Sequence, residues 1–215
     1  MNVVRGFERR LEKLLEGVAG RVFSGRLHPA EIAGKLAREA DFARFETDAG
    51  PATANAFTLL VNPKDLAIEP ATLEAELAEE VSRYTAEEGL RIEGPVLVRI
   101  QPSQEVAPGG VICHVEVSPG QSTPWARLVG DQTTDIGRNR VLVGRAPECD
   151  VVIDQSDVSR IHAHLWRERG SSWISDAGSS NGTFLDGSPV DASPREIQFG
   201  SVVAFASHQF RFTGV

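Results

Sequence analysis

Three short stretches decide the fold of the second half of the chain: Gly144-Arg145, Ser159-Arg160-Ile161-His162 and Ser179-Ser180-Asn181-Gly182-Thr183. Each follows a run of β-forming residues, at 140–143, 150–153 and 173–176 respectively. We therefore expect three loops at one rim of a β-sheet. An arginine, several hydroxyls and an asparagine at one rim supply the charged and neutral donors that a phosphate group needs.

Around these stretches the second half carries at least seven short β-like segments at close intervals. Asp186-Gly187 has the composition of a tight turn between 183–185 and 189–190. Two further segments, 202–205 and 209–212, have the spacing of a closing hairpin. This pattern predicts an all-β sandwich over residues 125–215.

In this order the three stretches resemble those of the forkhead-associated (FHA) domain, a module that binds phosphothreonine peptides. The resemblance implies that Arg145, Ser159 and Ser180 contact the phosphate, and that Asn181 holds the peptide main chain. Arg160 occupies a position that touches phosphate or peptide backbone in this family. An ion pair of Arg160 with Asp157 or Asp154 is the alternative that the sequence leaves open.

Five further residues are expected to support this site rather than to bind the ligand. The resemblance gives His162 the role of pinning the binding loop by hydrogen bonds, and Asp176 can fix loops through backbone N–H groups. Glycines and a threonine shape the turns. The supporting residues are Gly144, His162, Asp176, Gly182 and Thr183.

Two other chemistries fit fragments of the same region. Residues 178–182 match G-x-S-x-G, but a nucleophile elbow needs a helix after the serine, and a β-like run follows here. His162, His164 and Cys149 could contribute to a zinc site, but no four-ligand spacing accompanies them. We therefore expect no catalytic residues, no metal and no cofactor.

The first half alternates helix and strand patterns and predicts a small α+β domain with three helices and about three strands. Helices are expected from about Val3 to Leu15, from Pro29 toward Phe42, and after Pro70. The acidic run on the third helix is expected to be a solvated face. Strands are expected over 56–61, 96–101 and 111–117, with a hairpin loop over 102–110 between the last two.

Residues 3–12 and 23–33 give the first half, about residues 1–118, a resemblance to the N-terminal domain of actinobacterial FhaA-type regulators. The resemblance implies a place in the signalling system of transmembrane Ser/Thr kinases, with a role in peptidoglycan synthesis and cell shape. The implied partners are phosphothreonine-containing proteins, such as those kinases or cell-wall biosynthesis proteins.

The domain boundary is expected in a short linker, residues 119–124, which is rich in Pro, Gly and small polar residues. Residues 1–118 form the first predicted domain and residues 125–215 the FHA domain. The net charge of −8 is spread over both halves, and neither has the basic footprint of a nucleic-acid binder. Two cysteines, Cys113 and Cys149, give no disulfide framework.

We therefore expect a cytoplasmic, non-enzymatic adaptor that recruits phosphorylated partners and reaches the inner face of the membrane through them. No stretch approaches the ~20 apolar residues of a membrane span, and charges interrupt the N-terminal apolar stretch. The alternative is a kinase-responsive transcription regulator or nucleic-acid-associated protein in which the FHA domain acts as the sensor.

Overall fold

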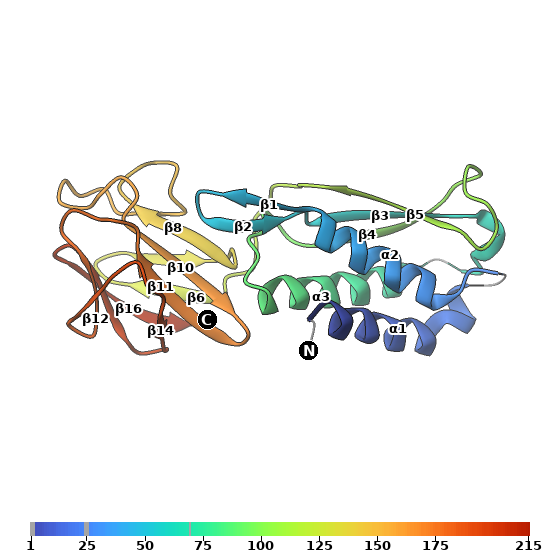
Figure 1. Cartoon of the computed structure of the whole chain (residues 1–215), viewed down its shortest axis with the longest axis horizontal. Coiled ribbons are helices and arrows are strands. Elements are labelled where there is room, and N and C mark those ends of the chain that lie inside the picture. Colours follow the sequence, from blue (N-terminus) through green and yellow to red (C-terminus); the bar gives the residue numbers. More distant parts are fainter. Residues whose placement is uncertain (1–2, 24–25, 69) are drawn as a thin grey trace. The chain divides into compact units, whose positions relative to one another are not determined.

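The computed structural model describes residues 3–23, 26–68 and 70–215 (Figure 1). The chain forms two compact units. Unit 1 comprises residues 1–45, 53–85 and 92–120, and unit 2 comprises residues 46–52, 86–91 and 121–215. Two short segments of the first half therefore belong to unit 2, whereas the sequence prediction places both in the first domain.

Unit 1 has its helices on one face of a three-stranded sheet (Figure 1). The helices are α1 (Val3–Val22), α2 (Pro29–Phe42) and α3 (Ala71–Glu87), with a short 3₁₀ helix η1 (Pro63–Asp65). The sheet strands are β3 (Ala56–Val61), β4 (Leu97–Pro102) and β5 (Val111–Glu116). The predicted α+β class of this half is confirmed. Among the described helices, none is long and apolar enough to cross a lipid bilayer.

The buried stripes of the helices form the core of unit 1. Phe7 of α1 stacks on Tyr84 of α3 with ring centroids 4.3 Å apart. Leu73, Leu77 and Val81 lie on the same face of α3 as Tyr84, and all four side chains are buried. The predicted position of α2 is confirmed, and the His28 side chain caps its first turn by accepting from the Ala30 amide at 3.2 Å.

Helix α1 continues beyond the predicted end near Leu15 to Val22. Gly17 and Gly20 each cost a helix about 1 kcal/mol relative to alanine, which favours an earlier end. Val22 and the following Phe23 are buried, however, at 6% and 8% exposure. Their burial offsets the low helix propensity of the glycines.

The prediction that the acidic run of α3 is a solvated face is wrong in part. Glu74 accepts from the Ile100 amide at 2.7 Å and pairs with Arg99 at 3.2 Å. Glu80 pairs with Arg10 at 3.0 Å. Two carboxylates of the run therefore connect α3 to β4 and to α1, and sequence spacing alone could not show these distant partners.

The predicted hairpin over 102–110 is also wrong. Strand order is β4-β3-β5, with β3 parallel to β4 and antiparallel to β5. Residues 103–110 therefore carry the chain across β3 instead of joining neighbours. The helical connection through α3 places β4 parallel to β3, and this leaves the opposite edge for β5.

A two-stranded hairpin of β1 (Arg44–Thr47) and β2 (Gly50–Thr53) was not predicted from the sequence. Its turn runs through Asp48 and Ala49, and Gly50 has φ +102, a backbone conformation that favours glycine. Thr47 Oγ1 donates to the Gly50 carbonyl at 2.8 Å and closes the turn.

Unit 2 is a β-sandwich, which confirms the predicted class. One sheet has the order β14-β11-β10-β8-β9 and the other β13-β12-β15-β16-β6-β7. The strands are β6 (Ala126–Val129), β7 (Thr133–Ile136), β8 (Arg140–Gly144), β9 (Val151–Val152), β10 (Ala163–Glu168), β11 (Ser171–Asp176), β12 (Thr183–Leu185), β13 (Ser188–Val190), β14 (Arg195–Ile197), β15 (Val202–Phe205) and β16 (His208–Gly214). Their inward side chains form one core cluster that includes Val143, Leu165, Ile174, Phe205 and Phe212.

Both predicted hairpins of the sandwich are present. Strands β12 and β13 pair across Asp186 and Gly187, which both have positive φ, at 48° and 78°. Two positive φ values are the mark of a type I′ turn, in which Asp is a favoured first residue. Strands β15 and β16 form the closing hairpin.

The carboxylate of Asp150, whose side chain is only 9% exposed, organises the first sheet of unit 2. Asp150 accepts two hydrogen bonds from Arg91, at 2.6 and 3.0 Å, and one from Arg138 at 2.8 Å. It also accepts from the Leu142 amide at 2.9 Å. The bidentate pair with Arg91 joins residues 86–91 to the strands within this unit.

Candidate functional site

Three strand ends of the first sheet meet at one edge of the sandwich. Ala163, at the start of β10, pairs with Val143 near the end of β8 and with Asp176 at the end of β11. Three connections leave this edge, and we call them the first loop (145–150), the second loop (153–162) and the third loop (177–182). All three quoted sequence stretches therefore lie at the same edge, and the structure brings together every candidate residue of the predicted site.

Gly144 allows the first two connections to approach closely. A Cβ atom at this position would lie 2.3 Å from the Arg160 carbonyl oxygen and 3.0 Å from Cys149 Sγ. In place of a side chain, two backbone hydrogen bonds join the loops, from the Arg145 amide to Ser159 O at 2.9 Å and from the Ala146 amide to Arg160 O at 3.0 Å. Residue 144 must be glycine for this pairing to form.

The Arg145 side chain is exposed and is held at one point. Its Nε donates to the Val158 carbonyl at 3.2 Å. A guanidinium has five N–H donors, and no other hydrogen bond or ion pair of this side chain is recorded within the described ranges. Arg145 thus presents a fixed positive charge with most of its donors available to an anion.

The side chain of His162 joins the second and third loops through hydrogen bonds. The ring is fully buried, with its edge against Phe205 at 5.7 Å between centroids. Nδ1 accepts from the Ser159 amide at 3.1 Å, so the ring proton lies on Nε2, which donates to the Gly182 carbonyl at 3.1 Å. One side chain therefore sets the positions of Ser159 and Gly182.

Asp176 organises the third loop. Its carboxylate accepts from the amides of Gly178 and Ser179, both at 2.8 Å, from Ser179 Oγ at 2.6 Å and from Thr183 Oγ1 at 2.7 Å. Partial burial raises the pKa of this carboxyl, but the hydrogen bonds from Ser179 and Thr183 outweigh burial and lower it. Asp176 is therefore an ionised anchor for the turn that carries Ser180 and Asn181.

The third loop is also tied to the second. Ser159 Oγ accepts from the Ser180 amide at 3.0 Å, and Asn181 Nδ2 donates to the Asp157 carbonyl at 2.7 Å. Gly182 has φ +80, and a Cβ there would lie 3.3 Å from the Phe184 ring. Among the described residues no acceptor is found for the hydroxyl hydrogen of Ser159, so this hydroxyl can both accept from the loop and donate to a ligand.

The alternative partners considered for Arg160 do not pair with it. Arg160 is exposed, and no ion pair to Asp157 or Asp154 is recorded among the residues that the structure describes. Asp157 instead accepts from Ser207 Oγ at 2.8 Å and pairs with His208 at 2.9 Å. Hydrogen bonds from His208 and Ser207 lower the pKa of Asp157 to about 2.

Sequence reasoning missed this role of Asp157. The carboxylate connects the second loop to the turn of the β15–β16 hairpin, while its backbone carbonyl holds Asn181. The only sequence sign was the position of Asp157 beside Val158-Ser159. Its partners lie 50 and 51 residues away, so spacing could not identify them.

The geometry does not place a catalytic serine or a zinc ligand set here. Both nitrogens of His162 bond to the backbone, and the strand β12 follows the 178–182 loop. His164 is half-buried on β10 and bonds to the Asp48 carbonyl at 3.1 Å. Within the described residues, no group of three or more His, Cys, Asp or Glu could hold a metal ion. Cys149 is a buried free thiol whose pKa is raised by burial.

A sandwich with these loops defines the class of the second half, and it matches the FHA domain model over residues 141–206. The first half matches the model "FhaA, N-terminal domain" over residues 4–114, just over half of the chain. The chain belongs to the FhaA-type family, in which this N-terminal domain accompanies an FHA domain.

Curated relatives match less than half of this chain. The glycogen accumulation regulator GarA of Mycolicibacterium smegmatis is 41% identical over 101 residues, which are 42% of this chain and 62% of that protein. The oxoglutarate dehydrogenase inhibitor of Corynebacterium diphtheriae is 39% identical over 69 residues, 30% of this chain and 48% of that protein. The chain thus spans about half the length of these relatives.

Among solved structures, a crystal structure of the FhaA FHA domain complexed with an intracellular domain of another protein is similar. It is 20% identical with a TM-score of 0.38, and the match covers 40% of this chain and 98% of that one.

Proposed function

We propose that this chain is a phosphothreonine-dependent adaptor without enzymatic activity. The observation that carries the proposal is the convergence of Arg145, Ser159 and Ser180 on one loop edge, with Arg160 and Asn181 beside them. A phosphothreonine at pH 7 carries about −1.5 to −2 charges and three acceptor oxygens. The free donors of Arg145 and the Ser159 hydroxyl match that charge and those acceptors.

The loops support this function because they are fixed before any ligand binds. His162 and Asp176 hold the second and third loops through hydrogen bonds to backbone atoms, and backbone hydrogen bonds from Arg145 and Ala146 tie the first loop to the second. A site that is already ordered loses little conformational entropy when a peptide binds. The net charge of −8 gives no long-range attraction for an anion, so recognition of the phosphate must be local.

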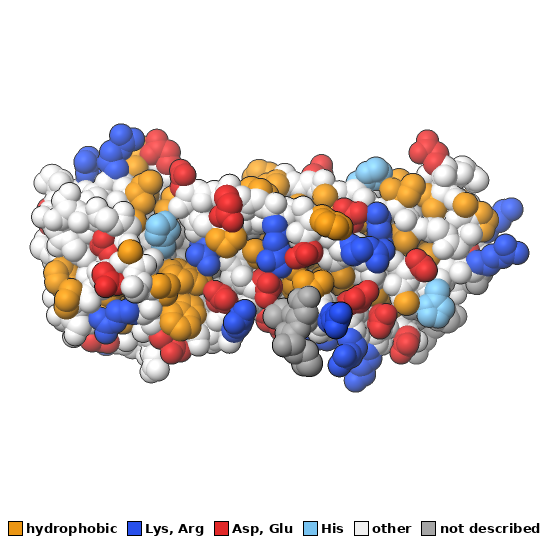
Figure 2. Space-filling model, in the orientation of Figure 1, with side chains coloured by type: hydrophobic (Ala, Val, Ile, Leu, Met, Phe, Trp, Pro, Cys, Tyr) orange, Lys and Arg blue, Asp and Glu red, His pale blue; other side chains and the backbone are white. Residues whose placement is uncertain are grey.

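The partners that we propose are phosphothreonine-containing proteins of a Ser/Thr kinase system, including the kinases themselves or proteins of cell-wall synthesis. Membership of the FhaA-type family supports this assignment, and the names of the curated relatives describe regulators of metabolism. In this role the chain works in the cytoplasm and meets membrane proteins through their phosphorylated segments. Figure 2 shows acidic and basic side chains interleaved on the face that it presents, unlike the basic stripe of a nucleic-acid binder.

The proposal is tested by calorimetric titration of the full chain with a phosphothreonine peptide. Arg145→Ala is expected to remove measurable binding and to leave the circular dichroism spectrum unchanged, because Arg145 is exposed and makes one hydrogen bond. Arg127→Ala is the matched control, since Arg127 is a partly exposed arginine on β6 of the other sheet. Parent-like affinity of a folded Arg145→Ala protein would disprove the site assignment.

A further inference from the structure

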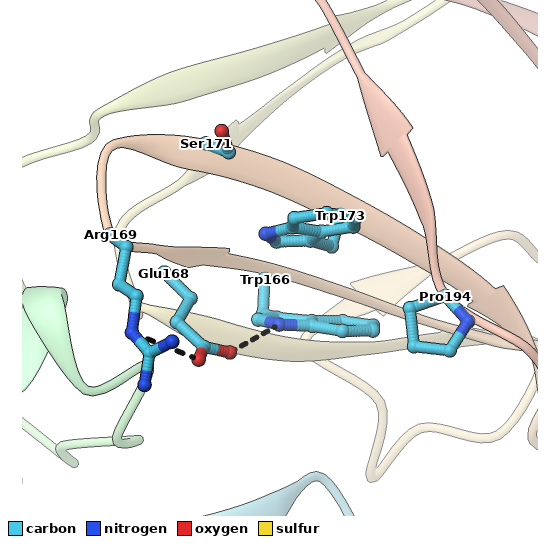
Figure 3. Close-up of a pocket in the computed structure, with 6 residues that line it drawn as sticks. All are labelled: Trp166, Glu168, Arg169, Ser171, Trp173 and Pro194. Carbon is cyan, nitrogen blue, oxygen red and sulfur yellow. Dashed lines mark hydrogen bonds and ion pairs between the residues drawn. The ribbon is translucent and has the colours of Figure 1, made fainter.

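A recess lies in unit 2, at the hairpin that joins β10 to β11. It has a volume of about 250 Å³ and is lined by Trp166, Glu168, Arg169, Ser171, Trp173 and Pro194 (Figure 3). Figure 3 shows the two indoles with their rings roughly parallel and Pro194 beyond the end of Trp166. We call this recess the tryptophan slot. None of its residues takes part in the phosphate-binding edge.

Four cross-strand neighbours set the order of side chains across the slot. Trp166 pairs in register with Arg140 on one side and with Trp173 on the other, and Trp173 pairs with Glu196. The Arg140 guanidinium lies over the Trp166 ring at 4.6 Å from its centroid. Trp166 is therefore held from one side by Arg140, and its other side faces the slot.

The two indoles differ in what their N–H groups do. Trp166 Nε1 donates to Glu168 at 3.4 Å, and Trp166 is 6% exposed. Trp173 is half-buried, and no hydrogen bond of its Nε1 is recorded in the described part of the chain. An apolar slot with a free indole donor at its rim favours a ligand with flat apolar groups and regularly spaced carbonyls.

Proline-rich segments have that chemistry. Their polyproline II conformation is preformed, their rings pack on aromatic side chains, and their carbonyls stay free to accept hydrogen bonds. A cationic group bound between the two indole rings fits the slot less well than a proline-rich segment does, because Arg140 and Arg169 already supply positive charge beside the slot. We propose that the tryptophan slot binds a proline-rich segment of a partner protein.

The charge at the rim specifies the segment further. Glu196 ends the cross-strand row, its carboxylate accepts from Ser171 Oγ at 2.7 Å, and no cation pairs with it among the described residues. Glu168 is only loosely paired with Arg169, at 3.9 Å. A basic residue beside the prolines would meet the Glu196 carboxylate, whereas an acidic one would be repelled.

The slot and the phosphate-binding edge lie at opposite ends of the same two strands. Strands β10 and β11 run from the edge at Ala163 and Asp176 to the hairpin at Glu168 and Ser171. Six residues of strand span roughly 20 Å, so occupancy of one site leaves the other free. The slot is therefore a contact separate from phosphothreonine recognition.

The test is a titration of the full chain with a synthetic oligoproline of about ten residues that has an arginine at each end. Indole N–H resonances are followed by nuclear magnetic resonance, and Trp173→Phe identifies the signal of Trp173 among the three tryptophans. A saturable shift of the Trp173 signal is expected. A peptide with the same arginines and alanines in place of the prolines is expected to give no shift.

Four variants separate this proposal from others. Trp173→Ala is expected to lower oligoproline affinity by about tenfold or more, and Trp173→Phe by a smaller factor, because a ring remains but the donor is lost. Glu196→Gln should weaken the arginine-flanked peptide and leave an uncharged oligoproline unchanged. Arg145→Ala, which removes the phosphate contact, should leave oligoproline binding intact.

The absence of a Trp173 shift, equal binding of the alanine peptide, or full affinity in Trp173→Ala would each overturn the proposal. An unchanged affinity of Glu196→Gln for the arginine-flanked peptide would overturn the proposed contact between Glu196 and a basic residue of the segment. None of these results depends on phosphothreonine binding, so they test the slot alone.

Discussion

The loop edge of unit 2 and the helical layer of unit 1 are ordered by different interactions. At the edge, His162 and Asp176 fix the second and third loops through hydrogen bonds to the backbone atoms of Ser159, Gly178, Ser179 and Gly182. In unit 1, α1 and α3 meet through apolar surfaces such as the stacked rings of Phe7 and Tyr84. Directional polar contacts need particular residue types, whereas apolar packing accepts many side chains of suitable volume.

This difference predicts separate consequences for mutations in the two regions. Phe7→Ala removes a fully buried ring, and we expect it to destabilise unit 1 by about 3–5 kcal/mol. Phosphopeptide affinity should be retained, because the site is built only from residues of unit 2. Hydrogen exchange resolved by mass spectrometry should show lost protection in β3 and retained protection in β10.

Leu165→Ala is the matched control, because Leu165 is fully buried in the sandwich core. Leu165→Ala should give lost protection from hydrogen exchange in β10 and retained protection in β3. If a Phe7→Ala protein retained the protection of β10 but lost peptide binding, then binding at the loop edge would depend on the packing of unit 1, against the prediction.

His162→Ala tests the polar side of the comparison. It leaves the Ser159 amide and the Gly182 carbonyl without their partner inside the protein, which costs about 1–3 kcal/mol of stability. We also expect phosphopeptide affinity to fall by about tenfold, since both loops lose their common anchor. Denaturant unfolding and calorimetry measure the two effects, and unchanged affinity would remove His162 from the support of the site.

The same contrast explains how far the sequence could be interpreted. Gly144, Ser159, His162 and Asn181 were recognisable because each position requires its residue type, by close approach or by a specific hydrogen bond. The hairpin expected over 102–110 was wrong because strand order depends on long-range packing that alternation does not encode. The partners of Glu74, Glu80 and Asp157 were invisible for the same reason.

Ser159→Ala and Asn181→Ala should weaken phosphopeptide binding by less than Arg145→Ala does, on the order of 1–3 kcal/mol each. Ser159 loses a neutral donor and also the acceptor that holds the Ser180 amide. Asn181 loses its bond to the Asp157 carbonyl. Calorimetry on the folded variants measures both losses, and a Ser159→Ala protein with full affinity would contradict the proposed phosphate contact.

The smallest effect concerns the side chain that carries the phosphate. Phosphothreonine and phosphoserine have the same charge, and the FHA resemblance implies a small apolar contact for the threonine methyl. Burial of one methyl contributes roughly 1 kcal/mol, so phosphothreonine should be preferred by several-fold. Paired titrations with two otherwise identical peptides check this, and equal affinities would count against the methyl contact.

The central claim is that the loop edge recognises a phosphate group on a peptide. The most direct measurement titrates the full chain with one threonine peptide before and after phosphatase treatment, under the same buffer and salt. We expect saturable binding of the phosphorylated form with one site per chain, and none of the dephosphorylated form at the same concentrations. Equal binding of the two forms would contradict the claim.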